Sequence, residues 1–126
     1  KRMTRFLISL PEAVDLIEWA YEHSDSHGCI VVPKLESLLV TDLALELGKS
    51  YGIDNLDLNY IGIRPGEKIH EEMVSLEESL RSEEHEKYFM ITDDIIKDNA
   101  FSFASNTVVM PRENVEQFLK EKGVIK

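Results

Sequence analysis

Apolar residues recur at helical spacing in the segment that follows Ser9. One face of this segment collects the apolar side chains Ala13, Val14, Ile17, Ala20 and Tyr21. Ser9 and Glu12 stand in the positions of a capping box, and Pro11 suits the first turn. The pattern therefore predicts an amphipathic helix that ends near residues 22–24.

Three further segments carry helix signals. Thr41 is a predicted N-cap, and Gly52 ends the helix that follows it. Ser75 and Glu78 form a second capping box in front of a short helix. A last amphipathic helix is predicted over residues 114–122, followed by a glycine.

Short apolar runs between the helices predict strands over residues 5–8, 29–32, 56–63 and 87–91. A further helical segment is expected from Glu67 onward. Strands and helices alternate along the first part of the chain, which favours an α/β lobe, or an α+β lobe that covers a larger partner. We expect residues 1–126 to form a single lobe, with residues 75–126 as a less regular C-terminal extension that ends in a helix.

Composition and charge argue for a globular domain and against two classes of function, nucleic-acid binding and binding to anionic membranes. The 126 residues are 43% hydrophobic and 30% charged, which is typical of a globular domain with a modest core. Lysine and arginine number 14 against 24 aspartates and glutamates, a net charge of −10. A chain this acidic repels phosphate backbones, so we expect it to bind neither nucleic acid nor an anionic membrane.

Cysteine and histidine suggest no special chemistry. Cys29 is the only cysteine, so no internal disulfide forms, and a reducing cytoplasm fits. His23 and His27 share a loop without a cluster of further ligands, so no metal site is predicted. No apolar run approaches the roughly 20 residues that span a bilayer. The chain begins with lysine, which suggests a piece of a longer protein, although Met3 is a conceivable start.

The corner at residues 64–67 carries the candidate chemistry. Pro65 restricts the residue before it to an extended conformation, and Gly66 permits a turn that a side chain would obstruct. Arg64 is thus presented beside Glu67. A guanidinium binds phosphate oxygens bidentately, and a carboxylate accepts hydrogen bonds from vicinal sugar hydroxyls, so the pair suits a nucleotide diphosphate. The alternative is a corner whose arginine and glutamate pair with each other or with solvent.

Catalytic motifs are missing from the sequence. The six glycines form neither a dinucleotide-binding nor a P-loop pattern. No serine sits in a nucleophile elbow, and no tyrosine is followed four residues later by lysine. The sequence therefore supplies binding groups and no catalytic residue.

Four separated motifs carry a resemblance to a known family. They are the opening Met3-Thr4-Arg5-Phe6 with the run that begins at Ile8, Ile30-Val31-Val32-Pro33-Lys34 together with Val40-Thr41-Asp42-Leu43-Ala44, Ile61-Gly62-Ile63-Arg64-Pro65-Gly66-Glu67-Lys68-Ile69-His70-Glu71-Glu72, and the tail Phe101-Ser102-Phe103-Ala104-Ser105 that leads into the last helix. In this order they resemble the C-terminal, substrate-binding region of extended short-chain dehydrogenases/reductases of the polysaccharide-biosynthesis group. That group includes UDP-N-acetylglucosamine 4,6-dehydratases and related epimerases.

The resemblance implies roles for particular residues. Arg5 and Arg64 match positions where the family places arginines on the sugar-nucleotide pyrophosphate, and Glu67 matches the acidic residue that holds the ribose hydroxyls. Lys34 and Lys68 stand in similar motif positions without a specific contact to argue for. The resemblance thus implies a UDP-sugar as the ligand.

The family's cofactor-binding and catalytic parts have no counterpart in this chain. The resemblance places them in an N-terminal Rossmann domain that binds NAD or NADP, so we expect no cofactor and no turnover for this chain alone. It implies a whole protein that is a cytoplasmic homo-oligomer and acts as a dehydratase, with a 4-epimerase or a dehydratase/5-epimerase as alternatives. A non-catalytic binding module is the third alternative. A lobe separated from its partner domain is expected to expose apolar surface and to self-associate.

Overall fold

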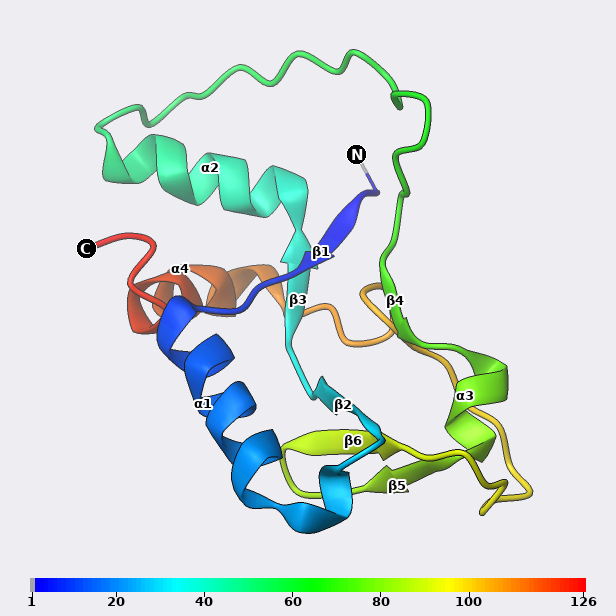
Figure 1. Ribbon diagram of the computed structural model, residues 1–126. Coiled ribbons are helices and arrows are strands. Elements are labelled where there is room, and N and C mark those ends of the chain that lie inside the picture. Colours follow the sequence, from blue (N-terminus) through cyan, green and yellow to red (C-terminus); the bar gives the residue numbers. More distant parts are fainter. Residues whose placement is uncertain (1) are drawn as a thin grey trace. The chain divides into compact units, whose positions relative to one another are not determined.

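Short helices and short strands make up the computed structural model, which describes residues 2–126 and only the backbone of Ser24. The elements are β1 (Thr4–Phe6), α1 (Leu10–Glu22), η1 (Ser24–Ser26), β2 (Ile30–Pro33), β3 (Ser37–Leu39), α2 (Val40–Ser50), β4 (Glu72–Val74), α3 (Leu76–Leu80), β5 (Ser82–Glu84), β6 (Tyr88–Ile91), β7 (Phe103–Ala104) and α4 (Arg112–Glu121). Figure 1 shows them along the chain. The named strand pairs are antiparallel, and the fold is mixed α/β, which confirms the predicted class.

The first of two compact units is built from three segments of the chain: Lys1–Leu7, Glu36–Glu71 and Ser105–Lys126. Strand β1 pairs with β3 so that Arg5 lies opposite Leu38. Helix α4 contributes Val115, Phe118 and Leu119, which lie on one face because they are three or four residues apart. They form a core with Leu38, and α2 packs against it. This core supports the β1–β3 pair that carries the N-terminal residues.

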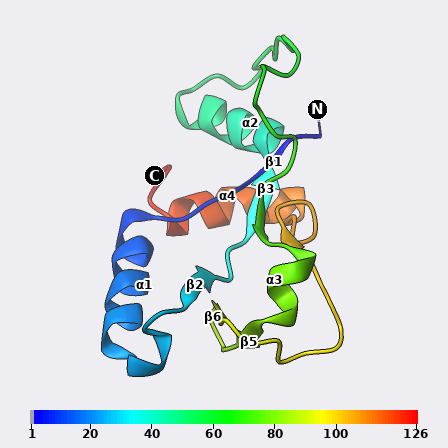
Figure 2. The same ribbon diagram turned by 45° about the vertical axis from the view of Figure 1, so that its right-hand side comes forward.

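The second compact unit is built from Ile8–Leu35 and Glu72–Ala104. Its central sheet has the order β2-β6-β5, and α1 contacts β2 (Figure 2). Phe89 of β6 is buried, and its ring centroid lies 5.3 Å from those of Phe101 and Phe103. Trp19 of α1 packs on Tyr88 with the ring centroids 4.6 Å apart. Aromatic contacts therefore hold much of this unit together.

Two predicted capping boxes are present. The Ser9 hydroxyl accepts the backbone N–H of Glu12, and the Glu12 carboxylate accepts the Ser9 N–H in return. Ser75 and Glu78 repeat this arrangement at the start of α3. Hydrogen bonds from the Ser75 backbone and side chain hold the pKa of the Glu78 carboxyl below its ordinary value. These reciprocal bonds explain why both helices begin where the sequence predicts.

The outer side of α1 is apolar and exposed. Leu10, Ile17 and Tyr21 are 81%, 68% and 83% exposed, and Val14 between them is 46% exposed. This is the exposed apolar surface that the sequence predicts for a lobe of a larger protein. Self-association stays a prediction.

The segment between α2 and β4 departs from the predictions. The strand expected over residues 56–63 and the helix expected from Glu67 are wrong, because residues 51–71 form no helix and no strand. Ile61 and Ile63 are 74% and 55% exposed instead of packing in the core, and the chain reverses at Gly66. The apolar run therefore has no partner strand within the described chain.

Smaller differences between the predicted and the observed elements concern helix starts and short strands. Thr41 is wrong as an N-cap, because Leu39 holds that position without a side-chain hydrogen bond and Thr41 lies inside α2. The prediction also missed β3, β4, β5 and β7, each of two or three residues. Strands this short lack an apolar alternation long enough to be recognised.

Candidate functional site

The Arg64-Pro65-Gly66-Glu67 corner is a β-turn. The Glu67 N–H donates to the Arg64 carbonyl at 3.0 Å, and the Glu67 carboxylate accepts the Arg64 N–H at 3.1 Å. Gly66 has a φ of +82°, which suits the third position of a type II turn, and proline is favoured at the second. The glutamate therefore binds the arginine's backbone, and among the ion pairs of residues 2–126 none joins the two side chains.

A pocket of about 630 Å³ opens beside this turn, within the first unit. It is lined by Arg2, Met3, Val40, Thr41, residues 59–64, Glu67 and Ile69. The volume lies in the range of small-molecule sites, which combine apolar walls with a few polar groups. The walls here include Met3, Val40 and Ile61, whereas Arg64 and Glu67 supply charge. Residues 59–63 belong to the apolar run that was predicted to be a strand, and they form one wall of the pocket.

The charge of the lining is opposite to that of the chain. Two arginines, Arg2 and Arg64, face one glutamate, Glu67, so the lining carries one net positive charge, whereas the chain carries −10. Both arginines are exposed. Positive charge in the lining favours an anionic ligand at this place in an otherwise acidic chain. The pocket suits an anionic ligand with an apolar part.

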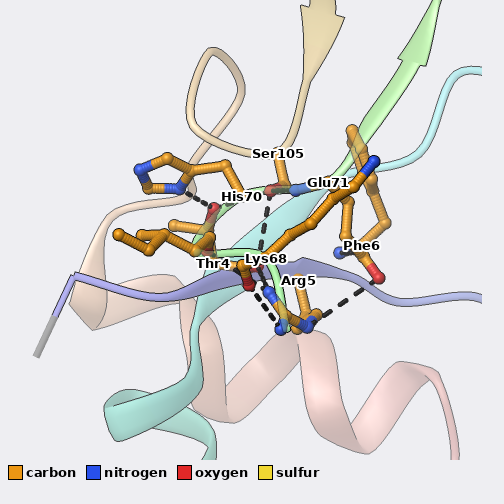
Figure 3. A network of polar contacts seen from close by, with 8 residues as sticks. Thr4, Arg5, Phe6, Lys68, His70, Glu71 and Ser105 are labelled. Atoms are coloured by element: carbon orange, nitrogen blue, oxygen red, sulfur yellow. Dashed lines mark hydrogen bonds and ion pairs between the residues drawn. The ribbon is translucent and has the colours of Figure 1, made fainter. Parts of the chain in front are cut away.

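Arg5 lies elsewhere, although the sequence groups it with Arg64 and Glu67. Its Nη1 donates to the carbonyls of Thr4 at 2.7 Å and Ile69 at 3.3 Å, and its Nη2 donates to the Lys68 carbonyl at 2.8 Å. Its Nε lies 3.8 Å from the Glu71 carboxylate. Figure 3 shows the guanidinium among these groups. The structure thus brings Arg64 and Glu67 together on the pocket and places the Arg5 guanidinium against the chain after the turn.

A buried polar network holds the same part of the chain (Figure 3). The Thr4 hydroxyl lies 2.7 Å from His70 Nδ1 and 2.6 Å from the Ser105 hydroxyl. The Glu71 N–H donates to the Ser105 hydroxyl at 2.8 Å, and Ser37 donates to the Ser105 carbonyl. Thr4, Ser37 and Ser105 are at most 2% exposed. Buried hydrogen-bonded groups of this kind fix a local conformation.

The two weaker lysine candidates have other surroundings. Lys34 donates to the Glu84 carboxylate at 2.7 Å and lies 4.9 Å from the Phe89 ring centroid. The bond and the charge of Lys34 hold the pKa of the Glu84 carboxyl below its usual range. Lys68 is exposed. Neither side chain belongs to the pocket lining as the structure describes it.

Across residues 2–126 no group of three or more His, Cys, Asp and Glu side chains is arranged to hold a metal ion. Within the same range, no helix is both long and apolar enough to cross a membrane.

Arg2 is the site residue that the sequence reasoning missed. It lines the pocket, whereas Arg5, three residues on, does not. Arg2 lies before β1 and outside the motifs that carry the resemblance, so no signal in the sequence marked it.

Comparison with known proteins gives consistent matches. A family model described as "Polysaccharide biosynthesis protein" matches residues 1–93. Over 104 residues the chain is 42% identical to a UDP-N-acetylglucosamine 4,6-dehydratase (inverting) of Campylobacter jejuni subsp. jejuni serotype O:2, covering 80% of this chain and 29% of that protein. Over 92 residues it is 40% identical to a UDP-glucose 4-epimerase of Rickettsia felis, covering 73% and 26%.

A solved structure supports the fold. The crystal structure of Pen from Bacillus thuringiensis superposes with a TM-score of 0.82 at 24% identity and covers 99% of this chain and 40% of that one. The chain therefore spans less than half of each of these proteins. Since the family model covers well over half of the present sequence, the chain belongs to the polysaccharide biosynthesis protein family.

Proposed function

We propose that residues 1–126 are the C-terminal, substrate-binding lobe of a UDP-N-acetylglucosamine 4,6-dehydratase-like enzyme in polysaccharide biosynthesis, and that they bind the nucleotide diphosphate of the substrate. Residues 75–126 are its C-terminal extension. The observation that carries the proposal is the pocket at which the turn of residues 64–67 presents an arginine and a glutamate. The named dehydratase relative supports the choice of ligand.

The diphosphate, the ribose and the pyrimidine of UDP each have a matching group in the pocket. The Arg64 guanidinium provides paired N–H donors and a permanent charge for the diphosphate. The Glu67 carboxylate is an acceptor for the two ribose hydroxyls. Apolar walls at Met3, Val40 and Ile61 suit the faces of the pyrimidine. The direct role of Arg5 at the diphosphate stays a prediction.

The nicotinamide cofactor of the wider enzyme group does not fit the residues of this chain. A dinucleotide site needs a glycine-rich turn that leads from a strand into a helix N-terminus. Among the described residues, α1 and α3 begin at serine caps, α2 at Leu39 and α4 at Pro111. In our proposal, NAD or NADP belongs to the remaining part of a cytoplasmic, homo-oligomeric enzyme.

A UDP-glucose 4-epimerase is the second candidate, because the relative of that name is nearly as similar. The proposed diphosphate site is the same for both reactions. The choice between them depends on groups that contact the sugar.

Calorimetric titration of UDP, UMP and uridine into the 126-residue chain tests the proposal. We expect one site per chain, with UDP binding roughly ten- to hundredfold more tightly than uridine, since a charge-assisted contact contributes about 1.5–3 kcal/mol. UMP is expected between the two. Equal affinities, or no binding by a chain whose circular dichroism shows it folded, would contradict the proposal.

A further inference from the structure

A second groove lies within the first compact unit, between helix α4 and the segment that leads into it. Its volume is about 460 Å³, which lies in the range of ligand-binding sites. It is lined by residues 108–111, by four residues of α4 and by Glu36, which precedes β3. None of them lines the pocket beside the turn of residues 64–67, so the groove is a separate candidate site.

One wall of the groove is the outer strand of a small sheet. Val109 forms a parallel bridge with Ser37 of β3, and β3 also pairs with β1. The Ser37 N–H donates to the Val108 carbonyl at 3.4 Å, and the Met110 N–H donates to the Ser37 carbonyl at 2.9 Å. Because β3 bonds to the residues on either side of Val109, the N–H and C=O of Val109 face away from β3.

This outer edge is open. Within residues 2–126, no backbone group pairs with the N–H or the C=O of Val109. A strand edge with an unpaired donor and acceptor is a template for a further strand. An extended peptide offers an acceptor and a donor at the spacing that these two groups require, whereas a small amine does not.

The groove is also negatively charged. Glu36 and Glu121 are exposed, and the lining that the structure describes contains no lysine, arginine or histidine. The Gln117 side chain donates to the Glu121 carboxylate at 2.8 Å. In the described part of the chain, however, neither glutamate forms an ion pair. The charge therefore favours a cationic group in the groove.

Apolar side chains lie beside these carboxylates. Phe118 is 6% exposed and belongs to the core of the first unit, and Met110 packs against the same core. Both line the groove. Arginine and lysine cover apolar surface with their methylene stems while their charged ends stay in water. A long cationic side chain thus matches both parts of the lining.

We propose that this groove binds an extended peptide segment of a partner protein, with the peptide backbone on the free edge at Val109 and an arginine side chain directed at Glu36 and Glu121. In this mode of recognition the backbone bonds give affinity and the side-chain site gives specificity. Arginine suits the site better than lysine, because its planar fork pairs with carboxylates bidentately. The proposal is independent of nucleotide binding at the other pocket.

NMR titration of the ¹⁵N-labelled 126-residue chain with a blocked pentapeptide, Thr-Val-Arg-Val-Thr, tests the proposal. We expect amide shifts to change at residues 36–37, 108–110 and 112–121, which line the groove or adjoin it. The same peptide with citrulline in place of arginine keeps the shape but loses the charge. It is expected to bind roughly tenfold more weakly, since the charge-assisted bonds are lost.

The strand edge is tested separately with methylated peptides. Methyl groups on alternate backbone nitrogens block one edge of an extended peptide and leave the other edge free. Of the two alternating patterns, one is expected to abolish binding and the other to preserve it, whichever register the peptide adopts.

Variants of the chain test the carboxylates. Glu36→Gln and Glu121→Gln are each expected to weaken the arginine peptide by roughly three- to tenfold and to leave the citrulline peptide unchanged. Glu116→Gln is the matched control, because Glu116 lies on α4, is exposed and is outside the groove lining. It removes the same charge from the same helix, so both affinities are expected to stay as in the wild type.

Several results would overturn the proposal. They are no binding of the arginine peptide by a folded chain, equal affinities for the arginine and citrulline peptides, or equal binding of the two methylated patterns. Equal losses in Glu116→Gln and in Glu36→Gln would mean that only the general charge of the chain matters. Spermidine that binds at the same residues as tightly as the peptide would identify a small polyamine site instead of a peptide site.

Discussion

Replacing Arg64 by alanine is expected to weaken UDP binding to the chain by roughly ten- to hundredfold, the equivalent of about 1.5–3 kcal/mol for a charge-assisted contact. Arg64 is exposed at the pocket, and Glu67 binds its backbone. The turn is therefore expected to survive the substitution. The guanidinium is lost while the pocket wall stays in place, so uridine is expected to bind as it does to the wild type. Calorimetric titration of both ligands measures the two effects.

Arg64→Lys refines this test. Lysine keeps the charge but lacks the planar fork that binds two phosphate oxygens at once, so an intermediate affinity is expected. Lys68→Ala serves as the charge control, since Lys68 is a close neighbour of Arg64 outside the pocket lining. Equal losses for Arg64→Ala and Lys68→Ala would mean that only the general charge of the segment matters, contrary to the proposed contact.

Replacing Arg112 by alanine is expected to lower the free energy of unfolding by roughly 1–3 kcal/mol, because a buried carboxylate loses a partner. Arg112 begins α4, and its Nη2 lies 2.5 Å from Glu46 of α2. The Glu46 side chain is only 5% exposed and keeps one other partner, Lys49, at 3.0 Å. Arg112 also lies 3.5 Å from Asp42. Chemical denaturation of the wild type and of Arg112→Ala measures the difference in the free energy of unfolding.

The loss of unfolding free energy in Arg112→Ala is expected to depend on pH in a defined direction. Burial raises the pKa of Glu46, but hydrogen bonds from Lys49 and Arg112 together outweigh it, so the pKa is lowered in the folded chain. A lowered pKa stabilises the fold above the ordinary value of 4.5, and this contribution is lost as the pH falls through the folded-state pKa. The difference between wild type and Arg112→Ala is therefore expected to be largest at neutral pH and to shrink below 4.5.

Lys120→Ala provides the control on the same helix. Lys120 pairs with Glu116, but the two side chains are 44% and 57% exposed. Exposed pairs contribute roughly 0.5 kcal/mol or less, so little change is expected at any pH. A similar loss for Lys120→Ala, or a loss for Arg112→Ala that is independent of pH, would contradict the importance of burial at Glu46.

Local signals in the sequence were sufficient for much of the fold. The capping boxes at Ser9 and Ser75 predicted where α1 and α3 begin, because both partners of each box lie within four residues. The turn at Pro65 and Gly66 was predicted for the same reason. Interactions between neighbours in sequence can be read from the sequence itself.

Features that depend on distant partners could not be predicted in this way. The apolar run before Arg64 has the composition of a strand, but within the described chain it finds no strand to pair with and lines a pocket. Conversely, Ser82–Glu84 is polar and acidic, yet it forms β5 because β6 supplies its hydrogen bonds. Pairing, rather than composition, decided both cases.

The residues of the candidate site divide in the same way, into those that local sequence predicts and those whose place depends on distant parts of the chain. Arg64 and Glu67 were predicted together because one turn holds both of them. Arg5 was grouped with them through the resemblance, although only the folded chain shows its bonds to the carbonyls of Lys68 and Ile69. Arg2 emerged from the structure, since its place at the pocket depends on a segment nearly sixty residues away in sequence.

The location of UDP on the folded chain tests the central claim most directly. In a titration of the ¹⁵N-labelled chain with UDP, we expect amide shifts to change at residues 2–3, 40–41 and 59–69, which line the pocket or adjoin it. The amides of β5 and β6 in the second unit are expected to stay unchanged. Shifts that gather in the second unit, or no shifts in a folded chain, would contradict the claim that the turn of residues 64–67 forms a nucleotide-diphosphate site.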